Sequence, residues 1–217
     1  MLSLRKFVLG IGVLALLCTP ALAQGQGRGF GGGMMGGGAQ MLGNPSVQKE
    51  LKFTEEQTSK AQTALTEIRE AHQEEMTALR DAEPAERMTK MAALNKAMTT
   101  EAVKALGLNE TQTKRFQQIS LQTRRAQAFV DPEVVAKLKI SDDQKKQIQE
   151  LTQESQTKGR EIFQNNQDDR AEAMKLIQAL QKEVGTKVMA LLSDDQTKSW
   201  KEMTGEPFEM VMVPRPN

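Results

Sequence analysis

The sequence predicts an all-α protein: elongated antiparallel helices from two tandem helical repeats, preceded by a disordered glycine-rich tail. Apolar residues recur every three or four positions over most of the chain, which is the spacing of one helix face. One sequence pattern also occurs twice, 87 residues apart, and no stretch alternates long enough to indicate a strand. We therefore expect helices throughout the region that follows the glycine-rich tail.

Residues 1–23 have the composition of a secretory signal peptide. Two basic residues precede an apolar run at 7–17, and small residues follow at the expected distance. We expect cleavage between Ala23 and Gln24, which places the mature protein in the periplasm of a bacterium or outside the cell. The apolar run is shorter than the roughly 20 residues that span a bilayer, so we expect no stable membrane span after signal removal.

The charge balance argues against a nucleic-acid-binding protein. The chain has 29 Lys and Arg against 28 Asp and Glu, a net charge of +1, and 4% aromatic residues. Nucleic-acid binders instead show a basic excess or a basic stripe with stacking aromatics. Loss of residues 1–23 removes two basic residues and Cys18, which leaves 27 basic residues, 28 acidic residues and no thiol. We expect no nucleic-acid partner, no disulfide and no redox site.

Residues 24–43 hold ten of the sixteen glycines in the chain. Glycine at this density loses much backbone entropy on ordering, which predicts a disordered tail. The thioethers of Met34, Met35 and Met41 are soft ligands of the kind that bind Cu(I). Because no His or Cys assists them, we interpret the segment as a linker that contains methionine.

An internal duplication organises the rest of the chain. Residues 44–57 align with 131–144, with five of fourteen positions identical and five more closely similar. A second match joins 103–112 to 188–196 with one residue dropped. Both matches are in the same order, which predicts two copies of about 85 residues.

The copies define three regions after the tail: a first repeat at 44–130, a second repeat at 131–203 and a C-terminal extension at 204–217. Breakers such as proline and paired asparagines separate the apolar stripes into four helices per copy. We expect Trp200 to anchor the last helix and the extension to trail away from it. The expected helices lie at about 45–51, 55–82, 85–106, 110–129, 132–138, 142–165, 169–191 and 194–203.

Four of these helices are expected to begin with a capping box. The cap side chain accepts a hydrogen bond from the amide three residues later, and a Gln at that position bonds back to the cap amide. Each cap stabilises its helix by about 1 kcal/mol. The four pairs are Thr54 and Gln57, Asn109 and Gln112, Ser141 and Gln144, and Ser193 and Gln196.

Each cap follows an apolar residue, and the unit so formed resembles the LTxxQ motif of the Spy/CpxP family of bacterial periplasmic stress proteins. The four units read FTEEQ at 53–57, LNETQ at 108–112, ISDDQ at 140–144 and LSDDQ at 192–196. The resemblance implies a thin, curved helical cradle that acts as an ATP-independent chaperone or as an envelope stress sensor. Family members carry two motifs and pair as homodimers, so four motifs imply a homo-oligomer or a monomeric pseudo-dimer.

The helix expected at 110–129 offers a candidate surface for unfolded clients or envelope proteins. Its cations lie beside an apolar stripe, and a basic surface with apolar patches can hold unfolded chains loosely. The alternative is that the apolar residues belong to the core and the cations to a solvated face. The candidate residues are Lys114, Arg115, Phe116, Ile119, Arg124 and Arg125.

Two other functions remain open, and catalysis is not expected. A branch of the family is zinc-responsive, but His72 lies on an apolar helix stripe, which favours a packed histidine over a metal ligand. We therefore assign no metal ligand and no cofactor. A structural or interaction module of the cell envelope is the other alternative. Paired carboxylates lie in first helix turns, where the dipole explains them, and no nucleophile with a base and an orienting group is evident.

Overall fold

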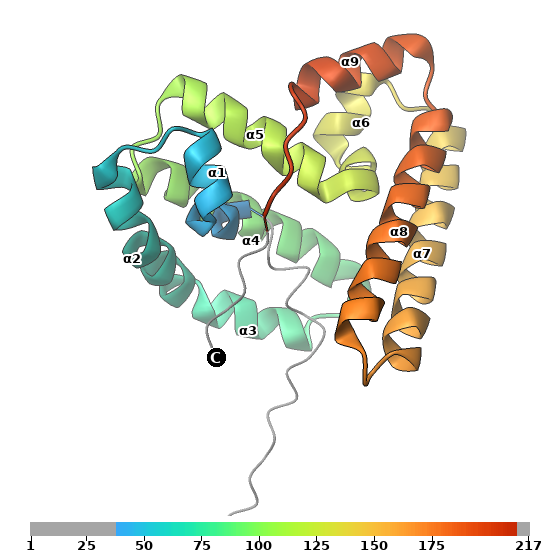
Figure 1. The fold of residues 1–217 in the computed structure, drawn as a ribbon, viewed down its shortest axis with the longest axis horizontal. Coiled ribbons are helices and arrows are strands. Elements are labelled where there is room, and N and C mark those ends of the chain that lie inside the picture. The colour runs from blue at the N-terminus through green and yellow to red at the C-terminus, as the bar shows by residue number, and fades with distance from the viewer. Residues whose placement is uncertain (1–37, 212–217) are drawn as a thin grey trace, which may run out of the picture. The chain divides into compact units, whose positions relative to one another are not determined.

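The computed structural model describes residues 38–211, apart from the side chains of Pro84, Ala85 and Met88, and this range contains helices and no strand (Figure 1). The predicted all-α class is therefore confirmed. None of the described helices is long and apolar enough to cross a membrane. The predicted signal peptide with its cleavage site, and residues 24–37 of the predicted tail, lie outside the described residues.

The order of the helices is the same in the two repeats. Each has a short helix that begins at proline, then a long helical stretch, then a long helix that runs back along it, then a helix that begins at a motif. In the first repeat the long helical stretch is broken in two. After η2 (Gly38–Gly43), the first repeat contains α1 (Pro45–Glu50), α2 (Glu55–Ala71), α3 (Gln73–Asp81), α4 (Pro84–Ala105), α5 (Glu110–Arg124) and η3 (Arg125–Val130). The second contains α6 (Pro132–Leu138), α7 (Asp142–Asn165), α8 (Arg170–Ala190) and α9 (Asp194–Thr204).

The backbone itself repeats at equivalent positions. Lys52 and Lys139, which are 87 residues apart, both adopt the left-handed conformation, with φ of 52° and 53°. Each ends a short helix and turns the chain into the next motif. A left-handed lysine is uncommon, so its recurrence at one register supports the duplication independently of the aligned letters.

Two of the expected helices are shorter than predicted. The helix expected at 55–82 is interrupted at His72, whose backbone leaves the helical region at φ −100° and ψ 14°. The helix expected at 110–129 ends at Arg124, because Arg125 has a φ of 51° and the chain continues as the 3₁₀ helix η3. The apolar spacing runs across both breaks, so periodicity alone did not locate them.

The prediction of a disordered tail is wrong for residues 38–43. These residues form the 3₁₀ helix η2, and Ala39, Met41 and Leu42 are buried against α1, α2 and α4. Burial of these three apolar side chains offsets the backbone entropy that the flanking glycines lose. Met41 is 2% exposed and belongs to the core of the first repeat, where its sulfur accepts a hydrogen bond from the Thr123 hydroxyl at 3.3 Å.

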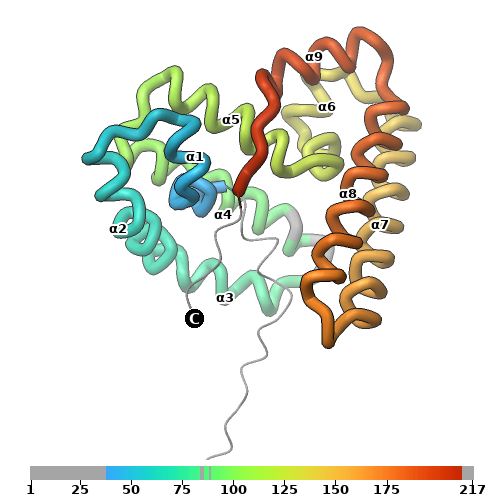
Figure 2. Tube along the Cα trace, in the orientation of Figure 1, coloured from blue at the N-terminus to red at the C-terminus, as the bar shows by residue number. Residues whose placement is uncertain are grey.

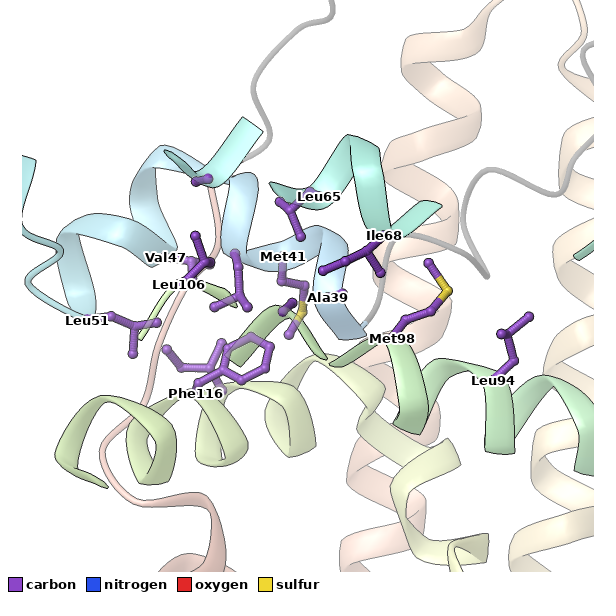
Figure 3. Packing of buried hydrophobic residues seen from close by; sticks show 14 of the residues in the cluster. Ala39, Met41, Val47, Leu51, Leu65, Ile68, Leu94, Met98, Leu106 and Phe116 are labelled. Carbon is purple, nitrogen blue, oxygen red and sulfur yellow. The ribbon is translucent and has the colours of Figure 1, made fainter. Parts of the chain in front are cut away.

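The first repeat has its own hydrophobic core, in which η2 lies between the longer helices (Figure 3). Helices α1, α2, α4 and α5 all contribute apolar side chains to it. Its most deeply buried large residues, each less than 2% exposed, are Met41, Leu42, Val47, Phe116 and Ile119.

A second, smaller core is formed by the second repeat together with Phe129 of η3. Helices α7 and α8 pack along each other (Figure 1). Ile148 on α7 and Val188 on α8 are fully buried in this core. The ring of Trp200 on α9 lies 4.3 Å from the ring of Phe129, with the two planes tilted by 39°. This contact joins α9 to η3, which is the anchoring that the sequence predicted for Trp200.

The C-terminal extension does not trail away as predicted. After α9 the chain runs back past α5 towards α1 (Figure 2). Phe208 and Met210 pack against the core of the first repeat. Residues 206–211, called the C-terminal segment below, therefore connect the end of the second repeat to the first, and residues 212–217 lie outside the described residues.

Gly205 makes the turn from α9 into the C-terminal segment. Its φ is 63°, a conformation that glycine adopts without the strain that a Cβ causes. A Cβ at this position would also lie 2.5 Å from the side-chain oxygen of Gln118 on α5. The positive φ therefore favours glycine at this position, and a Cβ would also displace the flexible end of the Gln118 side chain.

We expect Gly205→Ala to lower the free energy of unfolding by about 1–2 kcal/mol, because alanine is strained at positive φ and displaces Gln118. Gly185→Ala is the matched control: its Cβ meets nothing within 4 Å inside α8. That substitution should raise the free energy of unfolding by about 0.5–1 kcal/mol. Urea unfolding followed by circular dichroism measures both free energies. Equal changes in the two variants would show that the turn at residue 205 does not need glycine.

Candidate functional site

All four motifs form capping boxes. In the first, the Thr54 hydroxyl accepts from the Gln57 amide N–H at 3.1 Å, and the Gln57 side-chain oxygen accepts from the Thr54 N–H at 3.0 Å. Asn109, although it departs from the Ser or Thr of a strict box, makes the same two bonds with Gln112. The four caps therefore begin α2, α5, α7 and α9 with the same geometry.

The motif glutamines also bond to one another, which the sequence did not indicate. The Gln57 Nε2 donates to the Gln112 Oε1 at 3.1 Å, and the Gln112 Nε2 donates back to the Gln57 Oε1 at 3.0 Å. The remaining amide hydrogens reach the preceding helices: Gln57 donates to the carbonyl of Leu106 and Gln112 to that of Leu51. Each glutamine thus closes the start of one helix and the end of another.

The second repeat contains the same pair. Gln144 and Gln196 exchange hydrogen bonds of 2.8 and 3.0 Å. Their other amide hydrogens reach the carbonyls of Leu191 and Lys139. The first pair is buried and the second is partly exposed, so the two pairs share geometry and differ in access to water.

A cavity of about 440 Å³ lies beside the first glutamine pair. Lys52, Lys60 and Lys104 line it, and Lys60 is paired with Glu56 at 2.5 Å. In the second repeat, the residues aligned with Lys60 and Lys104 are uncharged, namely Gln147 and Met189. Lys52 aligns with Lys139, so one of the three cations is kept and two are lost while the glutamine pair is unchanged, which indicates that the pair does not depend on Lys60 and Lys104.

The apolar part of the predicted client surface on α5 is not a surface. Phe116 is 1% exposed and Ile119 is 0% exposed, and both belong to the core of the first repeat (Figure 3). The structure therefore favours the alternative, in which both residues belong to the core. Residues of α1 and η2, with Phe208 and Met210 packed against them, belong to the same buried cluster, and the local spacing of the stripe does not indicate these long-range contacts.

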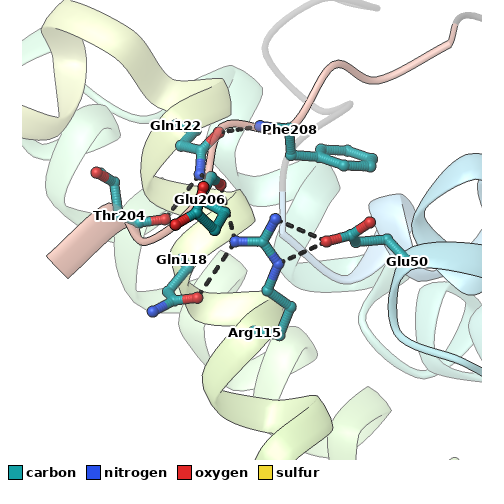
Figure 4. Close-up of polar contacts among 7 residues, drawn as sticks. All are labelled: Glu50, Arg115, Gln118, Gln122, Thr204, Glu206 and Phe208. Atoms are coloured by element: carbon teal, nitrogen blue, oxygen red, sulfur yellow. Dashed lines mark hydrogen bonds and ion pairs between the residues drawn. The ribbon is translucent and has the colours of Figure 1, made fainter. Parts of the chain in front are cut away.

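Two of the predicted cations are held in ion pairs. Arg115 contacts a Glu50 carboxylate oxygen at 2.7 Å, and its side chain is 17% exposed (Figure 4). Arg124 contacts Asp131 at 2.5 Å. Burial is the largest single influence on Asp131 and disfavours its charge, but the hydrogen bond and charge of Arg124, together with main-chain hydrogen bonds from Glu133 and Val134, outweigh burial and keep the pKa of the carboxyl below its ordinary value.

The other two cations are exposed. Lys114 projects from α5, and Arg125 donates a hydrogen bond to Gln181 on α8. The four cations therefore do not form one solvated basic face: Arg115 and Arg124 contribute to the packing of the repeats, while Lys114 and Arg125 are open to solvent.

The α5 side chains that face the C-terminal segment bind its main chain. The Glu206 carbonyl accepts from Arg115 at 2.9 Å and from Gln122 at 2.8 Å (Figure 4). Gln122 also donates to the Thr204 carbonyl at 2.7 Å, and its oxygen accepts from the Phe208 N–H at 2.8 Å. Gln122 alone therefore makes three hydrogen bonds to main-chain atoms.

The far end of the segment is held by α1. The Val211 N–H donates to the Ser46 hydroxyl at 3.2 Å, and the Val211 carbonyl accepts from the Asn44 side chain at 2.9 Å. Asn44 also caps α1 through its other side-chain atom. We call Asn44, Ser46, Arg115 and Gln122 the segment-binding surface.

Side chains of the segment alternate between the protein and solvent. Phe208 and Met210 are half-buried, whereas Pro207, Glu209 and Val211 are exposed. This is the period of an extended chain, in which successive side chains point to opposite faces. The short apolar-acidic alternation at 208–210 was the one signal in the sequence for this contact, whereas nothing local marked Gln122.

His72 lies at the break between α2 and α3, between two carboxylates. Its Nε2 is 3.1 Å from both Glu101 oxygens on α4, and its Nδ1 is 3.3 Å from a Glu75 oxygen. Only the protonated ring donates from both nitrogens. The hydrogen bond with Glu101 raises the pKa of His72, burial opposes this, and Glu75 adds to the rise. Among the described residues, no group of three or more His, Cys, Asp and Glu side chains could hold a metal ion.

We expect Gln57→Ala to lower the free energy of unfolding by about 1–3 kcal/mol, because Gln112 then loses two buried hydrogen bonds and the Leu106 carbonyl loses its side-chain donor. Gln144→Ala is the matched control, since it breaks the same cap and pair at a site that water reaches. Gln144→Ala should lower the free energy of unfolding by measurably less than Gln57→Ala does. A Gln57→Ala and Gln112→Ala double-mutant cycle should show a coupling of about 0.5–3 kcal/mol. If the two substitutions lower the free energy of unfolding additively, the hydrogen bonds between Gln57 and Gln112 do not stabilise the fold.

The raised pKa of His72 makes the stability of the fold depend on pH. The folded chain holds the proton more tightly than the unfolded chain, so this stabilisation is complete below the unfolded pKa of about 6.5 and is lost as pH rises through the folded pKa. Urea unfolding between about pH 6 and about pH 9 measures the free energy of unfolding of the unchanged protein and of His72→Gln, and the difference between them should shrink as pH rises. A difference that stays constant over this range would rule out a contribution of His72 protonation to stability. The chain has one His, which isolates the effect.

Comparison with known proteins returned no relative. No protein-family model matches the chain, and no curated protein and no solved structure is significantly similar to it. The function is therefore argued from the contacts of this chain alone.

Proposed function

We propose that this is an exported, ATP-independent chaperone-like protein that holds extended segments of unfolded polypeptides. One observation carries the proposal: the chain already holds an extended segment, residues 206–211, on α1 and α5, chiefly through hydrogen bonds to main-chain atoms.

Main-chain recognition suits a protein that binds many clients. Every unfolded protein offers the same carbonyl and N–H groups, so donors and acceptors aimed at them give affinity without a sequence requirement. The segment-binding surface supplies such groups from an Asn, a Ser, a Gln and an Arg, which together donate and accept. Apolar contact then comes from the core of the first repeat, against which Phe208 and Met210 of the resident segment pack.

The predicted signal peptide and the four cap motifs support the same proposal. A signal peptide would deliver the protein to the periplasm or the exterior, where a holding function that needs no nucleotide is appropriate. The four cap units resemble those of the Spy/CpxP family, which implies chaperone or stress-response activity. All four motif glutamines are paired within one chain, and this supports the monomeric pseudo-dimer over a dimer formed through the motifs.

Light scattering of several unrelated unfolded proteins tests the proposal. At equimolar ratio the protein should suppress their aggregation without ATP. In a background in which Phe208→Ser and Met210→Ser release residues 206–211 from the surface, Gln122→Ala should raise the concentration needed for suppression by about 3- to 30-fold, because a client then loses the two main-chain hydrogen bonds that Gln122 makes to the resident segment. Gln117→Ala is the matched control: it changes an exposed glutamine on the same helix and should leave suppression intact.

The result that would contradict the proposal is equally specific. A protein that suppresses no client, and that captures a single stable partner instead, is an interaction module of the envelope. Equal activity of the Gln122→Ala and Gln117→Ala variants would show that clients bind somewhere other than the segment-binding surface.

A further inference from the structure

We infer that the C-terminal segment is a built-in competitor for clients, and that the surface beneath it takes extended peptides with two apolar side chains two positions apart. The inference rests on the proposed function and adds the regulation and the client class of the same surface.

The client class follows from how the resident segment lies. Phe208 and Met210 face the core of the first repeat, while Glu209 between them and Val211 after them face solvent. Val211 is 63% exposed. In an extended chain, side chains two apart share a face, so the surface selects an apolar residue at two alternate positions and leaves the intervening one free. Unfolded proteins contain this pattern wherever a half-buried strand is encoded.

The resident segment is attached in a way that allows it to leave. Its hydrogen bonds to Arg115, Asn44 and Ser46 are exposed to solvent, and its two apolar side chains are only half-buried. Exposed hydrogen bonds and few buried contacts are the features of a segment that opens locally without global unfolding. The largest buried side chains of the first core all come from other elements, so they keep their mutual contacts when the segment opens.

The covalent link makes the segment an effective competitor. A short tether holds the segment near the surface at an effective concentration on the order of millimolar. A client at lower concentration therefore binds only in the molecules whose segment has opened. The apparent affinity for the client is then reduced by the fraction of molecules that are open. Loosening the segment should raise the affinity, and locking the segment should abolish binding.

A peptide that copies residues 205–211 and carries a fluorescein label is the probe, and fluorescence anisotropy measures its binding to the full chain. The releasing variant combines Phe208→Ser and Met210→Ser, which removes both inward side chains. It should bind the probe at least about tenfold more tightly than the unchanged protein, because its surface is open more often. The matched control combines Glu209→Ser and Val211→Ser, changes the outward residues of the same segment, and should bind as the unchanged protein does.

A reversible crosslink tests the same idea by locking the segment in place. The Val211 nitrogen lies 3.2 Å from the Ser46 hydroxyl, so the two residues are neighbours, and Ser46→Cys with Val211→Cys, in a Cys18→Ser background, can be joined by a short bis-methanethiosulfonate reagent. After crosslinking the protein should bind no probe and hold no client, and reduction should restore both. Mass spectrometry of the closed form confirms the crosslink. This lock decides the question even where the releasing variant is too unstable to fold.

The outcomes separate this inference from the proposed function. Equal probe binding in the locked and reduced forms, or in the releasing and control variants, overturns the inference; suppression of client aggregation by the unchanged protein would still leave the proposed function standing. Conversely, probe binding that is enhanced by release and blocked by the lock, with no client suppressed by any variant, supports the resident segment and its surface and refutes the chaperone function.

Discussion

The fold depends on the reciprocal hydrogen bonds between two glutamine side chains. In the first repeat, the Gln57 oxygen accepts from its own cap and from Gln112, while its amide donates to Gln112 and to the end of α4. A side-chain amide is suited to this because it both donates and accepts. The four helix ends that meet here would otherwise present unpaired main-chain groups in a buried place, at a cost of about 1–3 kcal/mol for each. The pair therefore sets where the helices begin and end.

This closure explains how the protein folds around two small cores. Each pair brings the starts of two helices to the ends of two others, so short apolar clusters suffice on either side. The copies then differ in how they fill the interior. The first repeat uses η2, whose Met41 and Leu42 occupy the space between its helices, and the second uses the contact of Trp200 with Phe129. Few aromatic residues are needed because neither interior is large.

The C-terminal segment gives one helix two functions. Helix α5 contributes Phe116 to the first core on one side and presents Gln122 to the segment on another. The same contact ties the last helix of the second repeat back to the first. In the proposed chaperone, stability and client binding therefore share a surface, and the segment that strengthens the fold is the one that clients displace.

The sequence by itself determined the helices, their caps and the duplication, because these depend on residues three or four positions apart or on one aligned register. Tertiary structure decided the rest. Gln57 and Gln112 are 55 residues apart, and Gln122 meets Phe208 across 86. Nor did local glycine content reveal that η2 would be covered on three sides. Periodicity marks which side of a helix is apolar, but the element that covers it is set by packing over long sequence separations. For that reason the stripe of Phe116 and Ile119 resembled a client surface in sequence and is core in the folded protein.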